Sequence, residues 1–173
     1  MNSNLEIERK FLVEMPDEGL LNVVERLNIL QTYLNNGEDN SQRRVRKICK
    51  DGVVSYVYTE KIFYSAKVRN EIEYEISVDE YERLIVQRKA ELKPIEKTRL
   101  RFLYREQLFE LDIYPFSHSR AILELELDDP EQKIFFPGFI RVIKEVTGVD
   151  AYSNSSLGNA GGFPEESETK GEI

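Results

Sequence analysis

The stretch RRVRKICKDGVVSYVYTEKI, residues 43–62, decides the fold class of this chain. Two runs rich in β-branched and aromatic residues flank the pair Asp51-Gly52, and such a pair is the strongest short-range signal of a β-hairpin. The first strand of the hairpin carries Arg44, and the second carries Lys61. The sequence therefore predicts an antiparallel hairpin whose strands bear cationic side chains.

Further strands with one charged and one apolar face lie on both sides of this hairpin. The segments LEIERKFLV, residues 5–13, and KVRNEIEYEIS, residues 67–77, alternate charged and apolar residues, and a period of two is typical of a β-strand. A second hairpin is predicted over residues 95–114, and AILELELDD, residues 121–129, forms another strand. This set of about eight strands, joined mainly as hairpins, indicates an α+β protein, or an all-β protein with added helices, with a closed or nearly closed antiparallel barrel.

Three short helices are expected beside the strands. Apolar residues recur at helical spacing in residues 19–30 and again in residues 138–147. Between them, Ser77 and Glu80 form a capping box before a helix that is ended by Pro94.

The composition bounds the protein class. A length of 173 residues suits one domain, which we expect to span residues 1–157 and to be followed by a mobile, Gly-rich and acidic tail at residues 158–173. The 24 Lys and Arg residues against 32 Asp and Glu residues give a net charge of −8, which argues against a nucleic-acid partner. The single cysteine, Cys49, excludes an intramolecular disulfide. Without a signal-peptide pattern or an apolar run of about 20 residues, we expect a cytoplasmic protein with no membrane partner.

The charged strand faces allow two interpretations. They are the wet side of an antiparallel sheet, which normally alternates in this way, or they line a site. The second interpretation rests on sorting: carboxylate pairs at i and i+2 occur on four strands, and cations gather on others. Two carboxylates roughly 7 Å apart on a strand repel by about 2 kcal/mol at an effective dielectric near 20. A sequence that served solubility alone is expected to interleave the signs.

Sorted charges of this kind suit a metal-complexed polyphosphate. Hard divalent cations such as Mg²⁺ and Mn²⁺ take oxygen ligands, while Arg and Lys bind phosphate oxygens. The usual phosphate-binding loops and the zinc motif HExxH are absent from the sequence. The lone histidine, His118, lies beside Pro115 and two serines and is expected on the surface.

An ordered set of motifs over residues 4–157 resembles the CYTH superfamily, the triphosphate tunnel metalloenzymes, and within it the short bacterial branch that favours inorganic triphosphate. The resemblance implies an eight-stranded antiparallel β-barrel that forms a tunnel with flanking helices. The motifs are ExExK at Glu6, Glu8 and Lys10, QxYL at residues 31–34, RxR at Arg44 and Arg46, a lysine at Lys61, RxExExE at residues 69–75, EKTR at residues 96–99, FELD at residues 109–112, LELEL at residues 123–127 and EVTG at residues 145–148.

The resemblance also implies roles for individual residues. Tyr33 pairs with Lys10 or Lys97 as a candidate proton acceptor. The roles of Glu71, Glu73, Glu75 and Arg101 stay open. The implied metal ligands are Glu6, Glu8, Glu124 and Glu126, with Asp112 as a further candidate, and the implied triphosphate ligands are Lys10, Arg44, Arg46, Lys61, Arg69, Lys97 and Arg99.

The function implied by the resemblance is Mg²⁺- or Mn²⁺-dependent hydrolysis of inorganic triphosphate to pyrophosphate and phosphate. A class IV adenylate cyclase, which makes cyclic AMP from ATP, and a thiamine triphosphatase are alternatives that keep the tunnel. A non-catalytic module that binds polyphosphate or nucleotide is the alternative from another class. The expected partner is a small-molecule triphosphate, and the fold allows a homodimer.

Overall fold

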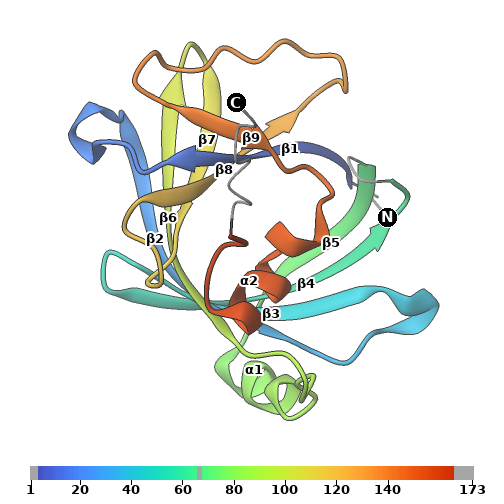
Figure 1. Ribbon diagram of the computed structural model, residues 1–173. Coiled ribbons are helices and arrows are strands. Elements are labelled where there is room, and N and C mark those ends of the chain that lie inside the picture. Colours follow the sequence, from blue (N-terminus) through green and yellow to red (C-terminus); the bar gives the residue numbers. More distant parts are fainter. Residues whose placement is uncertain (1–3, 66–67, 166–173) are drawn as a thin grey trace.

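The computed structural model describes residues 4–65 and 68–165. Antiparallel strands make up most of this part of the chain, and two short α-helices and three 3₁₀ turns connect or cover them (Figure 1). The strands are β1 (Asn4–Glu14), β2 (Val23–Tyr33), β3 (Gln42–Lys50), β4 (Val53–Phe63), β5 (Val68–Ile76), β6 (Ile95–Tyr104), β7 (Gln107–Ile113), β8 (Arg120–Leu127) and β9 (Val142–Glu145). The helices are α1 (Val78–Ile85) and α2 (Asn154–Ala160), and the 3₁₀ turns are η1 (Glu18–Leu20), η2 (Glu38–Asn40) and η3 (Asp150–Tyr152).

Eight of the strands close into a barrel. Their order is β5-β4-β3-β2-β6-β7-β8-β1, and β1 pairs back to β5 with Glu6 opposite Arg69. The short strand β9 pairs with β1 at Phe11, Leu12 and Val13, beyond the part that pairs with β5. The predicted eight-stranded antiparallel barrel is therefore confirmed, and closure leaves no open edge between β5 and β1.

The local signals at the predicted hairpin and at the capping box are confirmed. Asp51 and Gly52 have φ values of 51° and 78°, which match a type I′ turn between β3 and β4. The Ser77 side chain accepts a hydrogen bond from the Glu80 N–H at 3.1 Å, as in a capping box. Helix α1 nevertheless ends at Ile85, well before the proline that was expected to end it.

The helix predicted over residues 19–30 is wrong, because residues 23–33 form β2. Strand β2 pairs with β3 on one side and with β6 on the other, which fills the gap between the two predicted hairpins. Leu27 and Ile29 lie on one face of β2, and Val24 and Leu30 lie on the other. The apolar spacing that suggested a helix therefore comes from a strand with apolar residues on both faces, and long-range pairing overrides the local pattern.

The helix predicted over residues 138–147 is also wrong. Residues 142–145 form β9, and the Val146 N–H donates to the Lys10 carbonyl at 2.8 Å, which extends the pairing with β1. Backbone pairing with the exposed part of β1 satisfies the peptide groups of this segment. The helix near the chain end is α2 instead, and Ser153 caps it through the Ser156 N–H.

The boundary proposed between domain and tail falls inside α2. Leu157 is completely buried, and the Phe163 ring lies 5.8 Å from that of Tyr114 in an edge-on contact. Residues 158–165 thus belong in part to the packed structure. Residues 166–173 lie outside the described residues.

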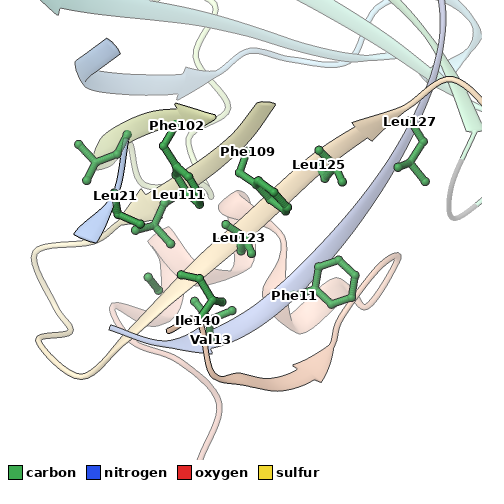
Figure 2. Packing of buried hydrophobic residues seen from close by; sticks show 12 residues of the cluster. Phe11, Val13, Leu21, Phe102, Phe109, Leu111, Leu123, Leu125, Leu127 and Ile140 are labelled. Carbon is green, nitrogen blue, oxygen red and sulfur yellow. The ribbon is translucent and has the colours of Figure 1, made fainter. Parts of the chain in front are cut away.

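Three apolar clusters are packed in the described residues. One of them joins α1 to β3 and β4 and consists of Leu34, Val45, Tyr58, Ile76 and Tyr81. The other two flank the barrel wall that carries the site. The outer core packs on the outward face of β1, β6, β7 and β8, and Figure 2 shows its side chains gathered there. It consists of Phe11, Val13, Leu21, Leu100, Phe102, Phe109, Leu111, Ala121, Leu123, Leu125, Leu127 and Ile140. The plug core lies at one end of the barrel interior, where α2 and η3 meet the strands, and consists of Leu12, Ile95, Tyr114, Ile122, Val146, Tyr152 and Leu157. The plug core closes that end against water.

Truncation of the plug core at α2 is expected to destabilise the protein. Leu157→Ala should lower the free energy of unfolding by about 2–5 kcal/mol, because it leaves a cavity in a fully buried position. The measurement is equilibrium unfolding in urea. Leu20→Ala, at a leucine that is 56% exposed, serves as the control and should change the free energy by no more than about 0.5 kcal/mol. Equal effects in the two variants would show that α2 does not pack as described.

Candidate functional site

The barrel interior changes from apolar to charged one layer above the plug core. Along β6, β8 and β1, and along β7 with the residue that follows it, one inward residue belongs to the apolar plug core and the next inward residue is charged. The apolar members are Ile95, Tyr114, Ile122 and Leu12, and the charged members are Lys97, Asp112, Glu124 and Lys10. The period of two places both kinds of side chain in the interior at successive levels.

Above this layer the barrel encloses a cavity of about 580 Å³. This volume lies within the range of ligand pockets in proteins, roughly 300–1,000 Å³. Of the residues predicted for the site, Lys97 and Asp112 lie outside the cavity wall. Those that line it are Glu6, Glu8, Lys10, Tyr33, Arg44, Arg46, Lys61, Arg69, Arg99, Glu124 and Glu126.

The charges are divided between two halves of the wall. The strands with inward carboxylate pairs, β7, β8, β1 and β5, are consecutive around the barrel. The other four, β4, β3, β2 and β6, are also consecutive; β4, β3 and β6 carry most inward cations, and β2 contributes uncharged residues to the wall. The two exceptions are Lys10 on β1 and Arg69 on β5. An anionic half-wall therefore faces a cationic half-wall across the cavity, which is the arrangement suited to a metal ion on one side and phosphate oxygens on the other.

On the anionic half-wall, Arg69 holds the carboxylates of β1. Its Nη2 atom lies 3.0 Å from Glu6 Oε2 and 2.7 Å from Glu8 Oε2. On the neighbouring strand, Lys61 Nζ lies 2.7 Å from Glu71 Oε2. Burial and a hydrogen bond with the Glu71 carboxylate raise the pKa of Glu6 to about 8. The carboxylates here are crowded, and cations only partly compensate their charges.

The deepest ion pairs join Lys97 and Arg99 to Asp112. The Asp112 Oδ2 atom lies 2.7 Å from Lys97 Nζ and accepts from Arg99 Nη2 at 2.8 Å, while Oδ1 accepts from Arg99 Nε at 2.7 Å. Burial alone raises the pKa of Asp112, but the charges of Arg99 and Lys97 outweigh burial and lower it. Both carboxylate oxygens of Asp112 are thus engaged by cations, and the side chain holds Lys97 and Arg99 in position.

Loss of the Asp112 carboxylate should destabilise the fold strongly. Asp112→Ala leaves Lys97 buried without its carboxylate partner, and breaking a buried ion pair in this way costs about 3–5 kcal/mol. Chemical unfolding checks this value. Asp128→Ala, at an exposed position, is the matched control and should leave stability almost unchanged. An Asp112→Ala variant as stable as the control would contradict the described ion pairs.

On the cationic half-wall, Arg44 is the cation with the least compensation. Arg46 Nη2 donates to Glu73 Oε2 at 2.7 Å, and burial and the nearby Arg44 charge lower the pKa of Arg46 to about 10. No carboxylate in the described part of the chain lies within ion-pair distance of Arg44. Arg44 therefore offers a positive charge to a ligand.

Tyr33 lines the cavity from β2 with its hydroxyl held by a neighbour. The Tyr33 hydroxyl accepts a hydrogen bond from Gln31 Nε2 at 2.7 Å, and both side chains are buried. Burial raises the pKa of Tyr33, although the charges of Arg44 and Lys10 oppose the rise. Among the described residues, no hydrogen bond joins Tyr33 to Lys10 or Lys97. The predicted pairing of Tyr33 with a lysine stays a prediction.

The donor chemistry of the anionic half-wall fits a hard divalent cation. Glu8 lies directly opposite Glu126 in the β1–β8 pairing, and this apposition of like charges is unfavourable without a cation. Burial and the carboxylates of Glu110, Glu71 and Glu8 raise the pKa of Glu126. In residues 4–65 and 68–165, no three Asp, Glu, His or Cys side chains converge closely enough to form a metal site as they stand. A metal ion therefore has carboxylate oxygens to bind but must draw them together.

Several residues of the cavity were not predicted. Glu110 pairs with Arg99 at 2.9 Å, and Glu73, whose role was left open, accepts hydrogen bonds from Arg46 and Thr59. The segment 146–155 lines part of the wall, and the Thr147 hydroxyl accepts from the Lys10 N–H at 2.9 Å. The EVTG motif was the sequence signal for this segment. Its assignment to a helix concealed the contact with β1.

The charges of the cavity wall nearly cancel. Seven Lys and Arg residues and eight Asp and Glu residues line it, so 7 − 8 gives a formal charge of −1.

His118 lies outside the cavity wall and is exposed, as expected. No helix in the described residues is both long and apolar enough to cross a bilayer.

Comparisons with known proteins place this barrel among characterised folds. No family model matches the chain, and no curated protein matches it in sequence. Among solved structures, NE1496 is 30% identical over 92% of this chain and 99% of its own, with a TM-score of 0.55. A second structure of the same protein, described as the inorganic triphosphatase NE1496, is 30% identical over 89% of this chain and 94% of its own, with a TM-score of 0.54.

More distant structures share the fold alone. PH1819 from Pyrococcus horikoshii is 21% identical over 72% of this chain and 79% of its own, with a TM-score of 0.54. HpAC1 from Hippeastrum, described as a putative adenylyl cyclase with a dominant triphosphatase activity, is 15% identical over 72% of this chain and 81% of its own, with a TM-score of 0.50. The same tunnel architecture therefore occurs in proteins of different descriptions.

Proposed function

The chain belongs to the CYTH family of triphosphate tunnel proteins, and from this membership we propose that it hydrolyses inorganic triphosphate to pyrophosphate and phosphate inside its barrel. The relative that is 30% identical over almost its whole length is an inorganic triphosphatase. The observation that carries the proposal for this chain is the division of the cavity wall into an anionic and a cationic half.

The cationic half-wall binds the phosphate oxygens. Arg44, which has no carboxylate partner among the described residues, supplies the least compensated charge, and Arg46 stands beside it on β3. Lys61 on β4 and Arg99 on β6 complete the set on this half-wall. Lys10 on β1 and Arg69 on β5 add cations from the opposite half. One guanidinium group can donate two parallel hydrogen bonds to phosphate oxygens, whereas an ammonium group acts as a point charge. The arginines therefore fix the orientation of the triphosphate.

The anionic half-wall holds the divalent cations. Glu6, Glu8, Glu124 and Glu126 are the ligands that we assign to Mg²⁺ or Mn²⁺. When bound, such an ion neutralises phosphate charge and lowers the pKa of a coordinated water. We assign Asp112 to the positioning of Lys97 and Arg99 rather than to metal binding, since both of its oxygens already accept hydrogen bonds from these cations.

Tyr33 is the candidate to take up the proton of the attacking water. The phenol is protonated at neutral pH because burial raises its pKa, so it must pass its own hydrogen to a neighbour as it receives the new one. Lys97 and Lys10 are ammonium groups in ion pairs with Asp112 and Glu124, so they donate hydrogen bonds and cannot accept that hydrogen. We therefore assign the hydrogen to an oxygen of the bound triphosphate, while the Lys10 charge stabilises negative charge on the Tyr33 oxygen.

A substrate panel tests the proposal. Purified protein is incubated with triphosphate, ATP and thiamine triphosphate, each with Mg²⁺ or Mn²⁺, and phosphate, pyrophosphate and cyclic AMP are measured. The expected result is release of phosphate and pyrophosphate from triphosphate with the highest kcat/KM. Cyclic AMP from ATP would identify a cyclase instead, and preference for thiamine triphosphate would identify that hydrolase. Tight calorimetric binding of triphosphate with no turnover under either metal would overturn catalysis altogether.

A further inference from the structure

Three buried side-chain atoms without a hydrogen-bond partner are neighbours on the barrel wall. Of the five such atoms in the described residues, Gln31 Oε1, Arg44 Nε and Arg46 Nε lie on the inward face of β2 and β3, and the other two belong to Asn70 on β5 and Arg101 on β6. Gln31 lies opposite Arg46, and Tyr33 lies opposite Arg44, across the β2–β3 pairing. Buried polar groups normally have partners, so an unpartnered group in a native fold calls for a reason. The proposed binding of phosphate explains the two arginines but does not explain an amide.

Gln31 sits behind the cavity rather than in it. Its side chain is fully buried and does not line the wall, whereas Tyr33 does. On the other side of β2, Gln31 lies opposite Ile95, which belongs to the apolar plug core. An apolar side chain would suit this layer, because a buried amide loses its hydration and here only its Nε2 atom regains a partner. The one contact that the amide makes is therefore the feature that explains its presence.

That contact determines which way the Tyr33 hydroxyl can point. The phenol oxygen accepts from Gln31 Nε2 at 2.7 Å. A hydroxyl has one hydrogen and can both accept and donate, so the Tyr33 hydrogen must be directed away from Gln31. Since Tyr33 lines the cavity, the hydroxyl is held with its hydrogen available to a group other than Gln31.

We propose that Gln31 is a positioning residue for the reaction assigned above: it holds the Tyr33 oxygen in place and directs the Tyr33 hydrogen away from itself, toward its acceptor in the tunnel. The inference rests on the proposed function for its catalytic consequence and on the Gln31–Tyr33 contact for its geometry. The charged and titratable groups that act on Tyr33 from other strands are Arg44 on β3, Lys10 on β1 and Tyr114, which follows β7. Gln31 adds to these an uncharged donor on the same strand as Tyr33.

The kinetic test uses two substitutions of Gln31. Gln31→Met keeps the shape of the side chain without a hydrogen-bonding group, and Gln31→Glu supplies a carboxylate that accepts from the phenol instead of donating to it. Both should lower kcat about tenfold and leave KM within about twofold, because one hydrogen bond of roughly 1.4 kcal/mol corresponds to a factor of ten. Combined with Tyr33→Phe, either substitution should cause no further loss, since Gln31 acts through the missing hydroxyl.

An NMR measurement tests the Gln31–Tyr33 contact without relying on activity. Carbon-13 at the Cζ position of tyrosine reports the state of each phenol by NMR, and Tyr33→Phe identifies the Tyr33 signal. Gln31→Met should shift that signal and raise the pH at which it titrates. Thr32→Val is the matched control, because Thr32 is a buried polar residue on the same strand whose side chain contacts Tyr81 on the opposite face. It should leave the Tyr33 signal and kcat unchanged.

The outcomes distinguish a failure of the positioning role of Gln31 from a failure of the proposed function. Losses from Gln31→Met and Tyr33→Phe that multiply in the double variant would overturn the positioning role, and so would an unchanged Tyr33 signal in Gln31→Met. If the wild-type protein fails to hydrolyse triphosphate, the proposed function falls, and the NMR comparison alone decides whether Gln31 holds Tyr33. Should Gln31→Met not fold, Gln31→Glu, compared with Thr32→Val by calorimetric unfolding, supplies the same readouts.

Discussion

Removal of divalent cations with a chelator is expected to lower kcat/KM for triphosphate hydrolysis by about 10²–10⁴-fold. A metal ion contributes several kcal/mol of charge stabilisation to phosphoryl transfer, and each 1.36 kcal/mol is a factor of ten in rate. The cavity wall has a formal charge near zero, and most of its cations, with Arg44 as the exception, already pair with carboxylates of the protein. A polyanion therefore needs additional positive charge to enter. Phosphate release with and without chelator measures the effect.

The same experiment has an internal control. Addition of Mg²⁺ or Mn²⁺ in excess of the chelator should restore activity, and thermal unfolding in chelator should show that the barrel remains folded. Calorimetry without metal should detect only weak binding of triphosphate. Full activity in the chelator would contradict the assignment of Glu6, Glu8, Glu124 and Glu126 as metal ligands.

Arg44→Ala should lower kcat/KM for triphosphate by about 10²–10³-fold. Removal of one preorganised group that stabilises charge in the transition state has this order of effect on catalysis. The stability of the variant should change little, because Arg44 forms no ion pair with a carboxylate of the described residues that its loss would disrupt. Steady-state kinetics measures the loss of kcat/KM, and urea unfolding measures the change in stability.

Lys47→Ala is the matched control for Arg44→Ala. Lys47 lies on the same strand, is exposed, and its loss changes the net charge of the protein by the same amount. It should leave kcat/KM within about twofold, since Lys47 lies on the opposite face of β3 from Arg44 and Arg46, does not line the cavity, and carries an exposed, solvent-screened charge. Equal losses in both variants would mean that overall charge, rather than a contact in the tunnel, controls activity.

Local signals in the sequence predicted much of the fold. The Asp51-Gly52 pair specified the β3–β4 hairpin, and the capping box at Ser77 specified the start of α1. Strand β2 was missed because its residues are apolar on both faces, and short apolar runs do not distinguish a strand from a helix. Strand β9 was missed because a four-residue strand has little signal of its own and forms through pairing with β1.

The site was predictable in its residue types and less so in their roles. The alternating charges and the motif set predicted a group of site residues, and all of them except Lys97 and Asp112 line the cavity. Asp112 looked like a metal ligand because it is a carboxylate on an inward face, yet Lys97 and Arg99 occupy both of its oxygens. Gln31 carries no charge and gave no signal beyond its place in the QxYL motif.

The sequence by itself determined that most strands have a charged face, with carboxylate pairs on some strands and cations on others, because the period of two is a local property of the chain. Only the tertiary structure decided that strands of like sign are neighbours. Strands β7, β8 and β1 meet β5 through closure of the barrel, although β5 precedes β6 in the chain, and β2 lies between β3 and β6. The order of strands around a closed sheet depends on long-range pairing. That order turns scattered charged faces into an anionic and a cationic half-wall around one cavity.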